Sequence, residues 1–455
     1  MKQNVNVSDQ ITLHIEKMGI NGEGIGYHDQ LAIFVDFALP EEDCLVEITE
    51  VFDNRAVAKV IEIYKESKYR ITPICPVYGR CGGCQTQHFD YDMMLNHKKE
   101  MIINAYKRYI KSPIDQEIIK DVIQSPKIYH YRNKAALPVR KLNGKNRFGM
   151  YMKHSNVFIP IDDCPIQNET INEILQSTVL LMDQIRLDAY DPKTKKGAMH
   201  SIIVRIAEYS NEVQVSFILL KADDRTKRLA KLLVGRHPMI ESVFEVIHKN
   251  SRKQSFFDGD IYLLYGKQAI VEHLNEQEFL LRPEAFFQLN TPQADMFYRE
   301  MKRMAGLKKY EVAIDAYAGI APVSHYIHDA VHQVYAIEID EDACQSAKLS
   351  LERNDIKNVT VLRSDFHKAL VGLKNKKVDV MFFDPPRSGL GEKTIESIIG
   401  FLPKRLVYGS CNPSTLAKDL NLLLEHYDLI ETQPLDMFPQ TSLVESISLL
   451  VRKPL

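Results

Sequence analysis

The stretch VAIDAYAGIAP, residues 312–322, reads as a buried strand ending at Asp315 and Tyr317, a tight turn at Gly319 and the start of a helix. Further apolar runs follow in VYAIEID, VTVLRSD, VDVMFFDPPRSGL and LVYGSCNPS. Strands that alternate with helices predict a parallel, doubly wound sheet. We therefore expect an α/β fold with a Rossmann-like domain over residues 286–455.

The ends of these strands carry the candidate cofactor-binding residues. Glu338 ends the second strand about 20 residues after the glycine turn, where an acid can bind both hydroxyls of a ribose. Asp365 stands at the tip of the third strand, and Asp384 ends the fourth in a loop with two prolines. This order favours an adenosyl cofactor without a pyrophosphate, and so S-adenosylmethionine over NAD.

The next strand leads to Cys411, which is followed by Asn412 and Pro413. These two residues predict a turn and a new helix near Ser414. A thiol at the carboxyl end of a parallel strand, facing a helix N-terminus, lies where its thiolate is favoured. Cys411 is therefore the candidate nucleophile. The structural alternative is a half-buried core cysteine.

The neighbours of Cys411 favour one reaction. The loop after Asp384 has neither the aromatic residue that would suit methylation of a base's amine nor the cysteine of enzymes that use two thiols on cytosine. One nucleophilic cysteine fits methyl transfer to C5 of uracil, because a thiolate that adds to C6 makes C5 nucleophilic. A base must then remove the C5 proton, and Glu445 in DMFPQTSLVES is the candidate. The alternative for Glu445 is an exposed acid at a strand end.

Three cysteines, Cys75, Cys81 and Cys84, gather in CPVYGRCGGCQ. Three thiols within ten residues predict a metal site, and Cys164 is the nearest remaining cysteine downstream for a fourth ligand. Four thiolates fit zinc or an iron–sulfur cluster, and the uneven spacing argues against a ribbon-type zinc site. The seven cysteines of the chain are an odd number for a disulfide framework and, in a reducing compartment, indicate metal binding or catalysis.

The first 65 residues read as a small antiparallel barrel. Four strand-like runs, QITLHIEKM, LAIFVDF, CLVEIT and AVAKVIEI, occupy residues 10–63, with four glycines between the first two runs. Barrels of this size often bind single-stranded nucleic acid. We therefore expect residues 1–65 to form an RNA-binding barrel.

A basic segment without a single Asp or Glu runs from Val122 to Ile161. It interleaves aromatic residues with eight basic ones, Lys127, Arg132, Lys134, Arg140, Lys141, Lys145, Arg147 and Lys153. Basic groups neutralise phosphates and aromatic rings stack on unpaired bases, so the segment favours RNA over a merely solvated face. The candidate RNA-binding residues are Arg132, Lys134, Arg140 and Arg387. Mixed α/β sequence continues to about Arg282, so we expect residues 66–285 to form a central α+β domain.

Composition sets the broad class. The chain has 455 residues, of which 45% are hydrophobic and 26% charged, as in ordinary globular proteins. Its formal net charge of −2 means that a polyanion must be bound by a local patch. The N-terminus lacks the apolar core of a signal peptide, and no segment approaches 18 uninterrupted apolar residues. We expect a cytoplasmic protein without membrane contact, and we infer no obligate protein partner.

Taken together, these motifs resemble the family of RNA uracil-5-methyltransferases that have an N-terminal TRAM domain and an iron–sulfur cluster. The likeness covers essentially the whole chain and rests on CPVYGRCGGCQTQH, YRNKA, FFQLN, DPPRSGL, SCNPSTLAKD and DMFPQTSLVE. It implies that Cys411 is the nucleophile and Glu445 the base, and that a four-iron four-sulfur cluster is held by Cys75, Cys81, Cys84 and Cys164. It also implies that S-adenosylmethionine contacts Gln288, Tyr317, Glu338 and Asp384. Relatives modify 23S rRNA or the T-loop of tRNA; 23S rRNA is the expected target here, with tRNA as the alternative.

Two positions depart from the family pattern. The cofactor turn reads DAYAGIAP where the family has a sequence like DxYCGxGT, so Ala321 replaces a glycine and Pro322 a threonine. Proline suits the first position of a helix, whereas a Cβ at Ala321 costs about 1 kcal/mol if that residue needs positive φ. Leu443 stands where the family has a histidine. The alternative function is therefore an RNA-binding member with weakened catalysis, although Cys411 and Glu445 favour an active enzyme.

Overall fold

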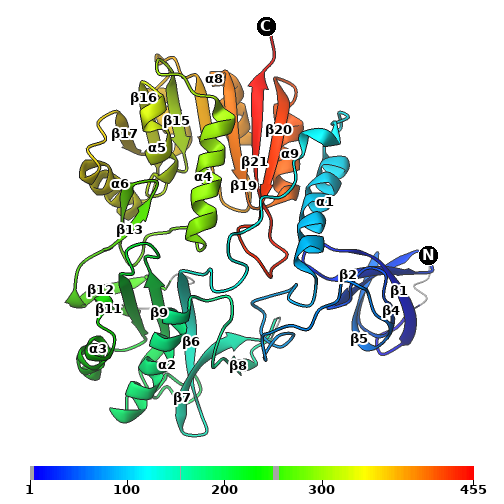
Figure 1. Cartoon of the computed structure of the whole chain (residues 1–455), viewed down its shortest axis with the longest axis vertical. Coiled ribbons are helices and arrows are strands. Elements are labelled where there is room, and N and C mark those ends of the chain that lie inside the picture. The colour runs from blue at the N-terminus through cyan, green and yellow to red at the C-terminus, as the bar shows by residue number, and fades with distance from the viewer. Residues whose placement is uncertain (1–4, 154, 249–255, 455) are drawn as a thin grey trace.

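The computed structural model describes residues 5–153, 155–248 and 256–454. In this part of the chain the strands form a closed barrel, two seven-stranded sheets and a two-stranded sheet. Figure 1 shows the C-terminal sheet at the top, the central sheet below it and the barrel at one side. The predicted α/β class, with an N-terminal barrel and a Rossmann-like C-terminal sheet, is confirmed. No helix within the described residues is both long enough and apolar enough to span a bilayer.

The barrel has the closed order β1-β2-β3-β5-β4 and consists of β1 (Gln10–Met18), β2 (Gly24–His28), β3 (Leu31–Asp36), β4 (Asp43–Phe52) and β5 (Arg55–Lys65). Four strands match the predicted runs. Strand β2 is not among the predicted runs, because its sequence GIGYH resembles that of a turn. A Cβ at Gly26 would lie 2.3 Å from the His14 carbonyl oxygen, so this glycine permits close strand packing. Strands β3 and β5 pair in parallel, so the expectation of a wholly antiparallel barrel is wrong.

The central sheet has the order β12-β11-β10-β9-β6-β7-β8. Its strands are β6 (Lys134–Leu142), β7 (Lys145–Tyr151), β8 (Phe158–Pro160), β9 (Met199–Ile206), β10 (Val213–Leu219), β11 (Ile240–His248) and β12 (Gly259–Gly266). Helices α2 (Glu169–Gln184) and α3 (Arg225–Arg236) share one buried apolar core with this sheet. A hairpin of β13 (Ile270–Leu274) and β14 (Gln277–Leu281) then leads to the C-terminal part.

The C-terminal sheet has the order β17-β16-β15-β18-β19-β21-β20. Its strands are β15 (Val312–Ala316), β16 (Gln333–Glu338), β17 (Val359–Arg363), β18 (Val380–Phe383), β19 (Arg405–Ser410), β20 (Tyr427–Leu435) and β21 (Glu445–Arg452). Strands β15 to β19 are parallel, as predicted. Strand β21 is antiparallel and lies between β19 and β20, so the sheet is mixed at this edge.

Helices cover the C-terminal sheet, most of them through two buried cores and one through a smaller cluster that contains Ala347 and Ala336. They are α4 (Thr291–Ala305), α5 (Pro322–Ile327), α6 (Glu341–Arg353), α7 (Phe366–Gly372), α8 (Glu392–Phe401) and α9 (Pro413–Leu423). Two short 3-10 turns, η1 (Gln116–Ile118) and η2 (His328–Ala330), complete the described elements.

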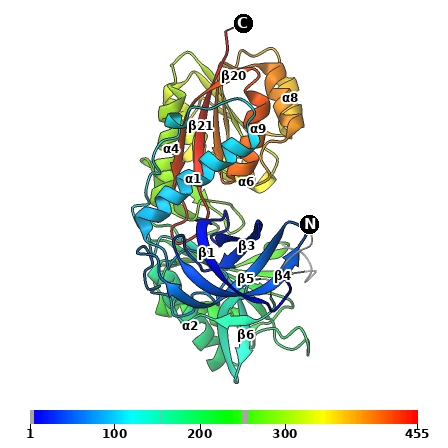
Figure 2. The same ribbon diagram turned by 90° about the vertical axis from the view of Figure 1, so that its right-hand side faces the viewer.

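Helix α1 (Tyr91–Tyr109) precedes the central sheet in sequence but packs on the C-terminal sheet. The buried apolar side chains of its C-terminal half, among them Ile102 and Tyr106, belong to the same core as α9, and the Tyr106 hydroxyl lies 2.9 Å from that of Thr432 in β20. Figure 2 shows α1 running between the barrel and the C-terminal sheet. The helix therefore reaches the edge of the sheet where the candidate site lies.

Candidate active site

Cys411 lies directly after β19, at the carboxyl end of this strand, and α9 begins at Pro413. Asn412 caps α9, since its Oδ1 accepts hydrogen bonds from the N–H groups of Ser414 at 3.0 Å and Thr415 at 3.4 Å. The turn and helix start thus lie where the sequence predicts them. They hold the thiol at the junction of strand and helix.

A pocket of about 280 Å³ surrounds Cys411, and its walls come from distant parts of the chain. They include Ile20 and Asn21 from the β1–β2 turn, Met101, Asn104 and Arg108 from α1, Arg387 from the loop after β18, and Leu443. Sequence reasoning missed the barrel turn and α1, because neither carries a motif. The nucleophile and the barrel turn therefore line the same pocket.

The loop DPPRSGL is fixed to α9 through Asp419. Its Oδ2 accepts hydrogen bonds at 2.7 Å from the Leu390 N–H and from the Tyr408 hydroxyl. Gly389 has φ +77°, and a Cβ there would lie 2.5 Å from the same oxygen. The Arg387 carbonyl accepts hydrogen bonds at 3.3 Å from two residues of the α9 turn, Asn412 and Thr415. These bonds place Arg387 beside the nucleophile.

The Cys411 thiol has a raised pKa. Burial and the charge of Glu445 raise it to about 11, Asp384 adds to the rise, and Arg387 opposes it. Burial beside two carboxylates thus disfavours the thiolate, whereas the favourable effect of the helix N-terminus stays a prediction. Arg387 is the neighbour that lowers the pKa of this thiol most, and so it is the side chain placed to promote ionisation.

Glu445 is the first residue of β21 and is only 5% exposed, so the alternative of an exposed strand-end acid is wrong. Burial raises its pKa well above the usual value, and Asp384 contributes to the rise. Arg387 and Lys98 lower the pKa of Glu445. Because Glu445 also raises the pKa of Cys411, the thiol and the carboxyl group share one electrostatic environment.

The predicted ribose acid and glycine turn lie in direct contact. Glu338 ends β16, and its Oε2 accepts a hydrogen bond from the Gly319 N–H at 2.8 Å. Its Oε1 accepts from the N–H groups of Ile339 at 2.7 Å and Asp340 at 2.8 Å. Asp365 caps α7 through backbone N–H groups of the first turn. The two acids therefore occupy neighbouring strand ends, each held by the backbone.

The altered cofactor turn contains two residues with left-handed backbone, Tyr317 with φ +60° and Ala321 with φ +62°. Pro322 follows in the first turn of α5, as predicted. Alanine in this conformation costs about 1 kcal/mol relative to glycine. Ala321 is fully buried in an apolar cluster with Ala318 and Ala336, which offsets part of that cost. The fold thus accommodates the substitution.

The remaining cofactor candidates are Gln288, which lies in the segment between β14 and α4, and Asp384, which lies at the end of β18. The carbonyl of buried Gln288 accepts a hydrogen bond from Asn133 Nδ2 at 2.8 Å, which joins the FFQLN and YRNKA motifs. Asp384 follows β18, and burial raises its pKa to about 6. Burial likewise raises the pKa of Asp315 in β15 to about 7, although Ser324 donates two hydrogen bonds to it. Carboxyl groups with raised pKa values thus gather where the parallel strands end.

Cys75, Cys81, Cys84 and Cys164 line one cavity of about 370 Å³. Within the described part of the chain, no group of three or more His, Cys, Asp or Glu side chains lies close enough together for a single metal ion. Arg132 lines the same cavity, and its buried Nε has no hydrogen-bond partner among the described residues. The cavity therefore combines four thiols with an unsatisfied cationic donor.

The residues predicted to bind RNA do not form one patch. Arg132 and Lys134 line the cysteine cavity, and burial with the charge of Arg205 lowers the pKa of Lys134 to about 6. Arg140 donates a hydrogen bond to the Tyr151 hydroxyl and lies 5.7 Å from the centre of that ring. Arg387 lies in the pocket of the nucleophile. Charge patterns did not reveal these differences because they carry no information about burial.

Comparisons with known proteins agree with this arrangement. Residues 90–453 match the family model described as tRNA (Uracil-5-)-methyltransferase, and residues 5–61 match that of the TRAM domain. The chain is 34% identical over 451 residues to an uncharacterised RNA methyltransferase of Bacillus cereus, covering 98% of both chains. It is 35% identical over 460 residues to one of Listeria innocua, covering 100% of both chains.

A solved structure shares nearly the whole fold. The tRNA (uracil-54, C5)-methyltransferase of Pyrococcus abyssi, in complex with S-adenosyl-L-homocysteine, is 25% identical with a TM-score of 0.79. The match covers 97% of this chain and 100% of that one. Family model, relatives and fold thus agree with the reaction that the sequence predicts. The chain belongs to the family of S-adenosylmethionine-dependent RNA uracil-C5 methyltransferases.

Proposed function

We propose that this enzyme methylates C5 of a uridine in 23S rRNA, with Cys411 as nucleophile and Glu445 as base. The observation that carries the proposal is the pocket at the carboxyl ends of β18 and β19. Cys411 and Arg387 line this pocket together with the barrel turn and α1, and Glu445 follows the wall residue Val444 directly. Glu445 raises the pKa of Cys411 and Arg387 lowers it. A base flipped out of its stack can reach such a pocket.

In the proposed mechanism, the Cys411 thiolate adds to C6 of the uracil and moves the electrons of the C5=C6 bond towards C5. Arg387 favours the thiolate in this step. After C5 is methylated, Glu445 removes the C5 proton, the C5=C6 bond forms again and the C6–S bond breaks. The thiol side chain is then regenerated for the next cycle.

S-adenosylmethionine supplies the methyl group on a positively charged sulfur. We propose that Glu338 binds the ribose hydroxyls and that the remaining contacts come from Gln288, Tyr317, Gly319, Asp365 and Asp384. The buried Asp384 carboxyl group, whose pKa burial raises to about 6, supports this assignment, because a nearby cation stabilises its charged form.

We further propose that Cys75, Cys81, Cys84 and Cys164 hold a four-iron four-sulfur cluster. The four thiols line one cavity without converging on a single ion, and the unpaired Arg132 Nε suits the anionic sulfur of a cluster. All seven cysteines of the chain are free, which fits a cytoplasmic, reducing setting. The proposed division of the chain is a barrel over residues 1–65, a cluster and RNA domain over 66–285, and a methyltransferase domain over 286–455.

A tRNA is the second candidate substrate, because the similar Pyrococcus abyssi enzyme is named for a tRNA uracil. Labelled methyl transfer to unmodified 23S rRNA and, separately, to tRNA transcripts decides between the two. The expected product is 5-methyluridine in 23S rRNA, and Cys411→Ala abolishes it. Label in tRNA alone identifies a tRNA enzyme. Tight RNA binding without any transfer would instead support the alternative of an RNA-binding protein with weakened catalysis.

A further inference from the structure

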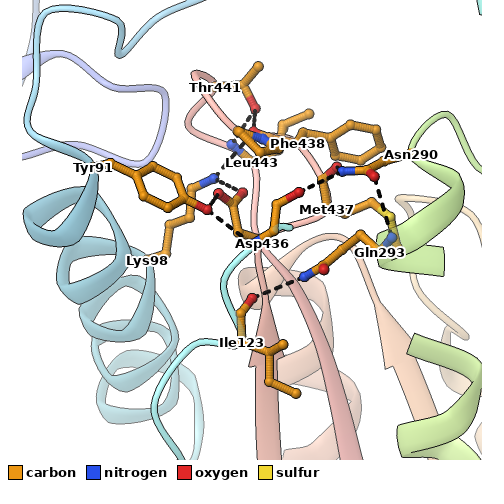
Figure 3. A network of polar contacts seen from close by, with 12 residues as sticks. Tyr91, Lys98, Ile123, Asn290, Gln293, Asp436, Met437, Phe438, Thr441 and Leu443 are labelled. Carbon is orange, nitrogen blue, oxygen red and sulfur yellow. Dashed lines mark hydrogen bonds and ion pairs between the residues drawn. The ribbon is translucent and has the colours of Figure 1, made fainter. Parts of the chain in front are cut away.

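A buried ion pair joins α1 to the segment that carries the catalytic base. Lys98 and Asp436 are both 0% exposed, and Lys98 Nζ donates a hydrogen bond to Asp436 Oδ1 at 2.5 Å. The same amine donates to the Phe438 carbonyl at 3.3 Å. Figure 3 shows the amine between α1 and the loop after β20. A lysine this deeply buried needs such partners, because burial disfavours its charged form.

Asp436 begins the catalytic loop, residues 436–444, which ends directly before Glu445. Its second carboxylate oxygen accepts a hydrogen bond from the Tyr91 hydroxyl at 2.8 Å, and its N–H donates to the Ile123 carbonyl at 2.9 Å. Asn290 of the α4 N-terminus donates to the Met437 carbonyl at 3.1 Å (Figure 3). The start of the catalytic loop is thus anchored on three sides.

Charges from several elements face Glu445. Asp384 disfavours its charged form, and Arg387 and Lys98 favour it. Cys411 and the buried Tyr298 hydroxyl also lie within its electrostatic reach. Arg387 is exposed, so solvent and salt screen its charge, whereas Lys98 is enclosed by protein. Of the two cations, Lys98 is the one whose effect on the base does not depend on the solvent.

Lys98 itself faces Asp436 and Glu445, which favour its charged form, and its neighbour His97, whose pKa burial lowers to about 4. Burial lowers the pKa of Lys98, and the charge and hydrogen bond of Asp436 oppose this fall, so the pair favours the charged amine within the protein interior. We infer that Lys98 is a positioning residue for the proposed base: it fixes the catalytic loop and keeps Glu445 ready to accept the C5 proton. This inference rests on the proposed function of Glu445.

A purely structural role makes a different prediction. If the ion pair only anchors the loop, a neutral pair of similar shape restores normal catalysis. If Lys98 acts on Glu445 by charge, the neutral pair folds but leaves the base more protonated. The step that suffers is proton removal, so methylated RNA remains bonded to Cys411.

The test compares two neutral pairs, Lys98→Met with Asp436→Asn and Lys98→Gln with Asp436→Asn, so that poor folding of one does not decide the result. Lys99→Met is the matched control, because Lys99 is the next residue on α1 and its partner Asp121 is exposed. Thermal unfolding and binding of S-adenosylmethionine show whether each variant is intact. Labelled methyl that stays with the protein on a denaturing gel measures the trapped RNA adduct, and Glu445→Gln sets its upper level.

We expect both neutral pairs to bind S-adenosylmethionine like the wild type, to trap methylated RNA and to release product about tenfold more slowly at neutral pH. The rising limb of their pH–rate profile moves up by about one pH unit, because the lost Lys98 charge lowers the pKa of Glu445 in the wild type, whereas burial and Asp384, rather than the lost Asp436 charge, raise it. Wild-type release and pH profile in a folded neutral pair would overturn the inference, as would failure of both pairs to fold. An inactive wild type, or an active Cys411→Ala variant, would instead overturn the proposed function.

Discussion

Cys411 shows how single side chains set the chemistry of this pocket. Its thiol is half-buried beside Glu445 and Asp384, and its pKa rises to about 11. The base needed at the end of the reaction therefore hinders the nucleophile needed at its start. Arg387 lowers the pKa of Cys411 and that of Glu445, so it favours both the nucleophilic thiolate and the basic carboxylate.

The charge of Glu445 has a measurable effect on this thiol. We expect Glu445→Gln to lower the pKa of Cys411 from about 11 towards the ordinary thiol value of 9.0, because a nearby negative charge is removed. The thiolate fraction at a fixed pH below 9 then rises by up to about tenfold for each unit of the shift. Alkylation of Cys411 by iodoacetamide, followed by peptide mass spectrometry between pH 7 and about 11, measures the change.

Arg387→Met is the opposing variant in that experiment, and it slows alkylation because the thiol loses its cationic neighbour. Loss of the cation raises the pKa of Cys411, and the reactive thiolate forms only as the pH rises towards that pKa. At a given pH below the pKa, alkylation of the variant is therefore slower. Identical pH profiles in the wild type and both variants would contradict the electrostatic account of the pocket.

At the scale of elements, the DPPRSGL loop, β19 and α9 form one unit around Asp419. The Asp419 carboxylate is held by the Tyr408 hydroxyl and the Leu390 N–H, so it has little freedom to move. The loop in turn places Arg387 against the strand–helix turn of Cys411. Strand β19 and helix α9 thus hold the loop that supplies the cation.

A glycine of this loop and the glycine directly after the loop provide a matched pair. Gly389 and Gly391 have φ of +77° and +75°, but only Gly389 would bring a Cβ against Asp419 Oδ2, whereas Gly391 has open space. We expect Gly389→Ala to reduce the free energy of unfolding by about 1–2 kcal/mol more than Gly391→Ala, because both share the backbone strain and one adds a clash. Urea unfolding measures the difference, and methyl transfer falls further in Gly389→Ala because Arg387 shifts. Equal losses in the two variants would show that the loop relaxes freely around Asp419.

At the scale of the whole molecule, main-chain and side-chain bonds join the cysteine cavity to the catalytic loop. The N–H groups of Gln85 and Thr86, directly after Cys84, donate to the Gln440 carbonyl at 3.2 Å. The Tyr131 hydroxyl donates to the Pro439 carbonyl at 2.9 Å. Direct hydrogen bonds therefore join the residues around the cavity to the segment that leads to Glu445.

We expect Cys81→Ala to lose iron and RNA affinity together, because the segment after Cys84 then loses its fixed position. Iron content and filter binding of RNA measure both effects. Cys344→Ala is the control, since that buried cysteine lies in α6, away from the cavity. Normal RNA affinity in an iron-free Cys81→Ala protein would contradict the proposed coupling.

Local patterns in the sequence predicted much of this molecule. Strand periodicity and the order of motifs were sufficient for the C-terminal sheet and for the position of Cys411 at a strand end. Strand β2 was not predicted, because glycines that permit close packing of strands cannot be distinguished in sequence from glycines of a turn. The burial of Arg132 and the raised pKa of Cys411 depend on neighbours distant in sequence. Local sequence patterns do not predict such contacts. They did not predict the position of α1 on the C-terminal sheet for the same reason.

The position of α1 also sets the order in which the protein can be completed during synthesis. Tyr106 on its buried face bonds to Thr432 and Ser448, and Lys98 bonds to Asp436. All three partners are synthesised more than 300 residues after α1. At about 5–20 residues per second, the ribosome needs roughly 15–60 s to reach them. The barrel and the cysteine segment leave the ribosome long before α1 finds its partners. The pocket around Cys411 is therefore among the last parts of the molecule to assemble.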